Sequence, residues 1–249
     1  MTRRLPDLVL IHGGGHAADC WDPTVAELRC QRPELRVLAI DLPGRRGKRG
    51  DLCTASIAGW VDSVVADVEA AGLDDVVIVG HSMAGLTVPG VVAALGASRV
   101  REMVLVAAFL PPQGASIVES LTGPLALLAR HGVRRRASGK VPTLAARYAF
   151  CNGMTAQQRA FTLSRLCADA ASVARECVDR SALPPGVPRT WILTTRDRAL
   201  SINSQTKSIE ALGGVDTAVR IDACHDVMIS HPQRLAEILL DRCLARQAL

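Results

Sequence analysis

The stretch Val76–Gly85 decides the fold; it reads Val-Val-Ile-Val-Gly-His-Ser-Met-Ala-Gly. Four β-branched residues predict a buried strand, and the residues after Ser82 predict a helix. A serine on a sharp turn between a strand and a helix holds a strained backbone and projects its oxygen into a cleft, as a nucleophile requires. Small residues must flank such a turn. Gly80 meets this need, and Ala84, followed by Gly85, stands where the pattern G-x-S-x-G has its last glycine. The alternative is that Ser82 only caps the helix that follows.

Short apolar strands alternate with helices on both sides of this turn. Strands are expected at Leu8–Ile11, Val37–Ile40, Val76–Val79, Met103–Ala107, Thr190–Leu193 and Ala218–Ile221. Helices are expected over about Thr54–Ala71, Met83–Leu95, Ile202–Leu212 and Pro232–Arg246. Strands that are apolar on both faces need helices on both sides of the sheet. The alternation therefore predicts an α/β fold with a mostly parallel, doubly wound sheet of about six strands.

Residues 111–188 break this alternation, since no strand is evident there and prolines bound the interval at both ends. Helices are expected at Leu121–Arg130, Thr143–Phe150 and Ala156–Asp179. We interpret residues 111–188 as a helical lid inserted into a core of residues 1–110 and 189–249. The alternative is an ordinary helical elaboration of the sheet.

Ser82 needs a base, and His225 is the best candidate because it follows the last expected strand and precedes the last expected helix. The acid is expected after the preceding strand, where Asp197 lies between Ser82 and His225 in the order serine, acid, histidine. Its carboxylate would accept the imidazole Nδ1–H, fix the tautomer and stabilise the imidazolium. Asp222 and Asp226, beside the histidine, compete for this role.

A glycine run supplies the remaining requirement, an oxyanion hole. The first expected strand ends in His-Gly-Gly-Gly-His at residues 12–16. Glycines let backbone N–H groups approach a ligand closely, and the N–H groups of Gly14 and Met83 are the natural pair. The same run also matches a relaxed dinucleotide fingerprint, with Asp41 where a ribose-binding acid would stand. That match leaves the serine turn unexplained.

Composition and charge argue against several other classes of function. The chain has 249 residues, of which 3% are aromatic, and a net charge of +5. Basic runs near residues 45–49 and 134–140 do not alternate with aromatic residues, so nucleic acid is not an expected partner. The N-terminal apolar run is too short for a membrane span or a signal peptide. The eight cysteines form no C-x-x-C pair and no zinc spacing, so we expect no metal and a cytoplasmic protein with reduced, mostly buried thiols.

Five motifs carry a resemblance to a known family. They are residues 12–15, Asp41-Leu42-Pro43-Gly44, Gly80–Gly85, Ala107-Ala108-Phe109-Leu110-Pro111 and His225-Asp226-Val227-Met228. Together they resemble the α/β-hydrolase superfamily, in particular the branch with plant methylesterases, polyneuridine aldehyde esterase and hydroxynitrile lyases. The resemblance implies that Ser82, Asp197 and His225 form a catalytic triad and that no cofactor is used. It also implies a possible homodimer.

Two departures from the lyase pattern favour ester hydrolysis. The plant-type lyases carry a threonine at the position of Gly13 and a lysine at the position of Asp226. The resemblance therefore implies a serine hydrolase, a carboxylesterase acting on a small apolar ester. We place Gly13, His81 and three leucines of the interval against the substrate: Leu121, Leu125 and Leu128. A hydrolase-fold receptor with little turnover is the alternative from a different class.

Overall fold

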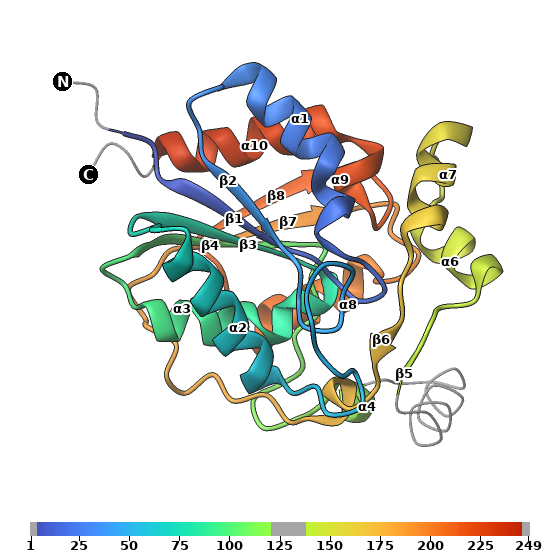
Figure 1. Cartoon of the computed structure of the whole chain (residues 1–249), viewed down its shortest axis with the longest axis horizontal. Coiled ribbons are helices and arrows are strands. Elements are labelled where there is room, and N and C mark those ends of the chain that lie inside the picture. The colour runs from blue at the N-terminus through green and yellow to red at the C-terminus, as the bar shows by residue number, and fades with distance from the viewer. Residues whose placement is uncertain (1–3, 121–137, 246–249) are drawn as a thin grey trace.

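The computed structural model describes residues 4–120 and 138–245. A parallel sheet of six strands runs through the molecule in the order β2-β1-β3-β4-β7-β8 (Figure 1). The strands are β1 (Asp7–Ile11), β2 (Val37–Ile40), β3 (Val76–His81), β4 (Val100–Val106), β7 (Arg189–Thr194) and β8 (Thr217–Ile221). The strand order reverses between β1 and β3, and ligands of such sheets bind at the carboxyl ends of the strands flanking that point. This confirms the predicted fold class.

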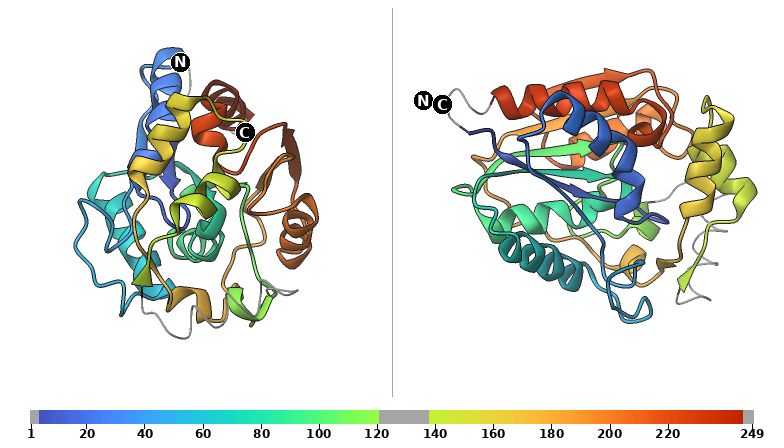
Figure 2. Two further views of the ribbon diagram at one scale, coloured as in Figure 1. Left: turned by 90° about the vertical axis from the view of Figure 1, so that its right-hand side faces the viewer. Right: turned by 45° about the horizontal axis from the view of Figure 1, so that its top comes forward.

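Helices cover both faces of the sheet, as the apolar strands require (Figures 1 and 2). One face carries α1 (Asp22–Gln31) and α10 (Pro232–Ala245), which contact each other, together with the short α9 (Val227–Ser230). The opposite face carries α2 (Ile57–Ala70), α3 (Val88–Leu95) and α8 (Ile202–Ala211). Trp21 and Leu239 lie in the first of the two apolar layers, and Trp60 and Trp191 lie in the second. The core is otherwise aliphatic.

The edge strand β8 is less buried than expected, and α1 is a helix that the sequence analysis did not predict. β3 is buried along its whole length, whereas β8 alternates between half-buried and exposed residues until the buried Ile221 at its end. β8 lies at one edge of the sheet. The helix α1 has only three buried residues and a proline in its first turn, which the missing N–H of proline tolerates. Its weak apolar pattern gave no prediction of a helix there.

All eight cysteines lie within the described residues and are free, and four of them are buried.

The chain between β4 and β7 crosses the carboxyl end of the sheet, where α6 and α7 stand beyond the strand ends (Figures 1 and 2). Its described elements are α4 (Ile117–Ser120), β5 (Ser138–Gly139), α6 (Thr143–Phe150), α7 (Ala156–Arg165) and β6 (Asp169–Ala170). The expectation of no strand was wrong, because β5 and β6 pair as a two-residue antiparallel ladder. The helix expected to run to Asp179 ends at Arg165. Residues 121, 125 and 128 lie outside the described part of the chain.

No helix within residues 4–120 and 138–245 combines the length and apolarity that a membrane crossing demands.

Candidate active site

Ser82 lies at the carboxyl end of β3 in a backbone conformation that side chains avoid. Its φ is +52°, and a 3-10 turn over Ser82–Leu86 separates it from α3, so the regular helix begins later than the sequence suggested. A Cβ at Gly85 would lie 2.5 Å from the carbonyl oxygen of Phe109, and one at Gly80 would overlap the side chain of Val88. The turn therefore depends on the small residues around it.

His225 links Ser82 to Asp197 in one hydrogen-bonded chain. His225 Nε2 lies 2.9 Å from Ser82 Oγ, and His225 Nδ1 lies 2.7 Å from Asp197 Oδ2. Ser82 Oγ thus faces a base. β7 and β8 end in register, with Arg196 N–H donating to the carbonyl of Ala223 at 3.0 Å, and this pairing brings the two loops together.

The carboxylate of Asp197 is fully buried and held from its own loop. Its Oδ1 accepts the N–H groups of Ala199 at 2.8 Å and Leu200 at 2.7 Å, and its Oδ2 accepts the hydroxyl of Thr194 at 3.0 Å. These donors satisfy the buried charge and aim Oδ2 at His225. The competing Asp222 instead pairs with Arg196 on the surface, at 2.9 Å.

His81 lies behind His225 and does not line the cavity, which differs from our expectation that it contacts the substrate. Its Nε2 donates to the carbonyl of His225 at 3.0 Å. Burial lowers the pKa of His81 to about 3, so its ring stays neutral. Phe150 stacks on the other side of the His225 ring, with centroids 5.4 Å apart. His225 is therefore held in place through its backbone carbonyl, which His81 contacts, and through its ring, which Phe150 contacts.

Two histidines hold the glycine loop. His12 Nδ1 donates to Gly13 O at 2.9 Å while its Nε2 accepts from Leu42 N–H at 3.2 Å, and burial lowers the pKa of His12 to about 3. His16 Nδ1 donates to Gly14 O at 2.8 Å. Sequence reasoning missed both roles, although the pattern His-Gly-Gly-Gly-His places one histidine at each end of the loop.

The loop brings Gly14 next to Met83, as expected for an oxyanion hole. A Cβ at Gly14 would lie 3.4 Å from Met83 Sδ, and β1 and β3 are in register at Ile11 and Gly80. Within the described residues, no group accepts a hydrogen bond from Gly14 N–H or Met83 N–H. Gly13 passes so close to Ser82 that a Cβ there would lie 2.8 Å from Ser82 Cβ. A side chain at that position would require Ser82 or the His81 backbone to shift.

His16 and Asp226 form a buried pair behind the loop. His16 Nε2 lies 3.0 Å from Asp226 Oδ2, and both side chains are almost inaccessible. Burial alone would lower the pKa of His16, but the Asp226 carboxylate and the Gly14 carbonyl raise it above 6.5. Burial likewise opposes the charge on Asp226, yet His16 lowers its pKa below 3.8. Since both ring nitrogens of His16 face acceptors, the ring is an imidazolium paired with a carboxylate.

We expect Asp226→Asn to lower the free energy of unfolding by about 3–5 kcal/mol at pH 5.5, because it leaves His16 buried without its partner. The raised pKa of His16 contributes stability that is present below pH 6.5 and lost as the pH rises through the folded value. The lowered pKa of Asp226 contributes stability that is lost as the pH falls below 3.8. The destabilisation is therefore largest between about pH 4 and 6.5.

Urea unfolding of wild type and variant at pH 5.5 and pH 9 measures this difference. The control is Asp222→Asn, whose carboxylate is 74% exposed and whose loss changes stability by less than about 0.5 kcal/mol at both pH values. An equal loss at pH 5.5 and pH 9 for Asp226→Asn would show that the pair is not ionised in the folded protein.

Ser82 opens into a cavity of about 250 Å³ between the sheet and the segment that follows β4. The described lining residues are Gly14, Gly15, Ser82, Met83, Phe109, Ile117, Val141, Phe150, Asp169, Ala199, Leu200 and His225. Apolar side chains dominate this wall. Gly14 and Met83 are among the lining residues, whereas Gly13 and His81 are not.

Three side chains at the back of the cavity, of which His225 lines it, have the composition of a metal site. Ligand atoms of His81, His225 and Asp226 lie within 4.8 Å of one another. His225 uses both ring nitrogens for Ser82 and Asp197, and His81 Nε2 donates to a carbonyl oxygen. Both ring nitrogens of His225 are therefore engaged within the protein, whereas His81 Nδ1 and Asp226 Oδ1 have no hydrogen-bond partner among the described residues.

Comparisons with known proteins identify the family. The sequence profile of the alpha/beta hydrolase family matches residues 8–238. The chain belongs to the alpha/beta hydrolase family. One similar structure is an extracellular alpha/beta-hydrolase from a Paenibacillus species, which shares homology with tobacco salicylic acid binding protein 2. It superposes with a TM-score of 0.84 at 20% sequence identity, and the match covers 95% of this chain and 98% of that chain. The methylesterase MES16 from Arabidopsis superposes with a TM-score of 0.77 at 17% sequence identity, and the match covers 95% of this chain and 98% of that chain.

A curated protein adds a sequence match. The carbendazim hydrolyzing esterase of Nocardioides sp. (strain SG-4G) is 34% identical over 119 residues, which is 47% of this chain and 48% of the relative. The chain thus matches about half of that relative's length. The resemblance to the α/β-hydrolase superfamily, first drawn from five short motifs, is confirmed by the family profile. The methylesterase MES16 shares the fold of this chain.

Proposed function

We propose that this alpha/beta hydrolase is a serine carboxylesterase that cleaves small apolar esters through an acyl-enzyme. One observation carries the proposal: the chain Ser82 Oγ–His225–Asp197, with distances of 2.9 and 2.7 Å, opens into a cavity with a mostly apolar wall. A nucleophile, a base and an orienting acid within hydrogen-bond distance are the groups that acyl transfer needs. The name of the Nocardioides relative supports hydrolysis of an ester.

In the proposed acylation, Ser82 Oγ attacks the ester carbon while His225 Nε2 takes its proton. Asp197 stabilises the imidazolium that forms. The N–H groups of Gly14 and Met83 donate to the oxyanion of the tetrahedral intermediate. His225 then gives the proton to the departing alcohol, and the acyl group stays on Ser82.

In the proposed deacylation, a water molecule occupies the place that the alcohol has left. His225 Nε2 removes its proton, the hydroxide attacks the acyl carbon, and the collapse of the second tetrahedral intermediate returns the proton to Ser82 Oγ. Phe150 and Leu200 give this wall of the cavity an apolar surface. Electrostatic interactions inside the cavity are therefore stronger than in water.

The test is hydrolysis of p-nitrophenyl esters of increasing acyl length by the purified protein. A burst of p-nitrophenol followed by sustained turnover supports the esterase. A receptor on the same fold would give a single turnover at most, together with ligand-dependent binding of a partner. Absence of turnover on every ester of the panel would contradict the proposal.

We expect no cyanide release from mandelonitrile above the buffer rate. Gly13 carries no hydroxyl to hold a cyanohydrin, and a side chain there would overlap Ser82. The described lining of the cavity includes no lysine or arginine that would stabilise cyanide. Enzymatic release, measured with a cyanide-selective assay, would show that a group elsewhere stabilises this anion.

We also expect no binding of NADH or NADPH at micromolar concentration. Asp41, which stands where a ribose-binding acid would, accepts the backbone N–H of Ala18 at 2.7 Å. The N–H of Gly15 is taken by Asp169 at 2.7 Å, so this part of the loop is not free to bind a pyrophosphate. Titration calorimetry measures the binding, and a micromolar dissociation constant would contradict the assignment of the glycine loop to an oxyanion hole.

A further inference from the structure

One ionised side chain on the cavity wall takes no part in the proposed reaction. Asp169, on β6, lines the cavity with an 18% exposed side chain, among Phe109, Ile117, Val141 and other apolar neighbours. We propose that Asp169 is a substrate-recognition residue, which accepts a hydrogen bond from an N–H or O–H group next to the scissile carbonyl. This inference rests on the proposed esterase function and names the class of ester that the cavity prefers.

The hydrogen bonds of Asp169 leave one acceptor position open. Oδ1 accepts from the Arg45 guanidinium and from Ala170 N–H at 2.8 Å, and Oδ2 accepts Gly15 N–H at 2.7 Å. A carboxylate offers about four lone-pair positions, and acceptance at both oxygens marks it as ionised. Among the described residues, Oδ2 therefore keeps one lone pair without a donor. Because the Asp169 side chain is partly exposed to the cavity, this position can accept a hydrogen bond from water or from a ligand.

The carboxylate lies next to the atoms that would hold the oxyanion. A Cβ at Gly14 would be 2.8 Å from Asp169 Oδ2. A negative charge so near an oxyanion would oppose the reaction on its own. Arg45, whose side chain is fully buried, compensates for it through the ion pair with Asp169. The pair thus provides a strong acceptor with little net charge.

The segment that carries Asp169 is fixed to the core by two contacts directly before Asp169. Cys167 N–H donates to Gly15 O at 2.9 Å, and Arg45 also donates to the carbonyl of Ala168 at 2.7 Å. These contacts explain why α7 stops at Arg165 rather than continuing, because a helix would withdraw the N–H of Cys167 from the glycine loop. The segment therefore holds Asp169 in one place relative to Gly14.

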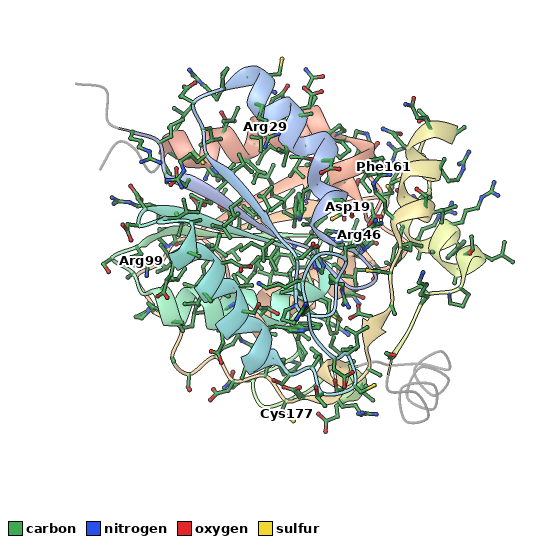
Figure 3. The ribbon with its side chains drawn as sticks, viewed as in Figure 1. Asp19, Arg29, Arg46, Arg99, Phe161 and Cys177 are labelled. Atoms are coloured by element: carbon green, nitrogen blue, oxygen red, sulfur yellow. The ribbon has the colours of Figure 1, made fainter. Side chains whose placement is uncertain are left out.

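A second ion-pair group secures the same junction. Asp19 and Arg46 lie side by side near the start of this segment (Figure 3), with Arg46 Nε 3.0 Å and Arg165 Nε 3.4 Å from Asp19 Oδ2. Arg165 also stacks on Phe161, 3.7 Å from the ring centre. A fixed acceptor selects between substrates more sharply than a mobile one, since little order is lost on binding.

Two pairs of methyl esters of nearly equal shape test the proposal on the wild-type protein. Methyl mandelate carries an α-hydroxyl where methyl 2-phenylpropanoate carries a methyl group. Methyl N-acetylphenylglycinate carries an N–H where methyl O-acetylmandelate carries an ester oxygen. Methanol release gives kcat/KM, and each value is divided by the ester's rate constant for hydrolysis by hydroxide.

We expect the donor in each pair to raise the corrected kcat/KM by about tenfold to a hundredfold, as a hydrogen bond to a charged group does. The two pairs distinguish a hydroxyl from an N–H as the group recognised. Monomethyl phenylmalonate, which is anionic, should be hydrolysed more slowly than methyl 2-phenylpropanoate, since its carboxylate has no proton to donate to Asp169 and loses its hydration on entering the cavity. Equal corrected rates within both pairs would overturn the proposal.

Variants separate the carboxylate from its partner. Arg45→Met together with Asp169→Leu replaces the buried ion pair by apolar groups, a change that proteins often tolerate. The matched control, Arg45→Met alone, keeps the carboxylate. Labelling of Ser82 by a fluorophosphonate reports that each active site is intact. We expect the preference for donors to fall to within about threefold of unity in the double variant and to persist in the control.

Persistence of the preference in a labelled double variant would overturn the assignment to Asp169. The proposed function fails in a different way, through absence of turnover on all esters. Turnover of simple esters with no preference between the paired esters would contradict only the inference about Asp169.

Discussion

Ser82→Ala is expected to reduce kcat for ester hydrolysis by about a millionfold and to abolish covalent labelling by a fluorophosphonate. The reason is that Ser82 Oγ is the atom that would attack the ester, and it lies 2.9 Å from the base, His225 Nε2. Alanine keeps the Cβ and removes only the oxygen. Residual hydrolysis above that in water would come from binding and from the oxyanion hole.

The fold should survive this substitution. Ser82 already occupies φ = +52°, and alanine meets the same backbone strain as serine. Thermal unfolding of the variant should therefore remain within a few degrees of wild type, and Ser63→Ala on α2 serves as a control that keeps full labelling. Labelling that persisted in Ser82→Ala would place the nucleophile on another residue.

The parts of the site that the sequence predicts are those that depend on strand ends. Ser82, Asp197 and His225 each follow a strand of one parallel sheet, and carboxyl ends of parallel strands meet at one edge. Order along the chain and the rule for parallel sheets are therefore enough to expect these three side chains together. The six strands were expected from their short, mostly apolar runs, and all six lie in the sheet.

The parts that the sequence does not predict depend on contacts between distant loops. His16 and Asp226 are 210 residues apart, and Gly15 and Asp169 are 154 apart. A carboxylate at position 169 has the same sequence pattern as any solvated loop residue, and only the fold brings it to the glycine loop. Helix propensity continued the expected helix through that region, whereas the hydrogen bonds of Cys167 to the loop favour an extended chain there.

His81 shows how one such contact changes an interpretation. As the neighbour of Ser82 it was expected to contact the substrate. Successive side chains of a strand point to opposite faces, and the His81 ring is directed behind His225 instead of into the cavity. Its neutral state and its hydrogen bond to the carbonyl of His225 make it a support for the loop that carries the base.

Asp197→Asn is expected to lower kcat by about ten-thousandfold, the loss seen when a triad acid becomes an amide. The hydrogen bonds of Asp197 fix which way the amide must turn. Its Oδ1 accepts the N–H groups of Ala199 and Leu200, and an amide NH2 placed there would face two donors. The amide oxygen therefore stays at this position, and the NH2 group points toward His225 Nδ1.

That orientation selects the unproductive tautomer of the base. An NH2 group donates to Nδ1, so the ring proton moves to Nε2, which then cannot accept the proton of Ser82. The measurement is kcat on one p-nitrophenyl ester for Asp197→Asn, with Asp222→Asn as control and Asp226→Asn corrected for its folded fraction. Since Asp222 pairs only with surface groups, its change should leave kcat within about twofold of wild type. A larger loss in Asp222→Asn than in Asp197→Asn would move the acid to the loop that precedes His225, and the 2.7 Å contact between Asp197 and His225 would then have no catalytic role.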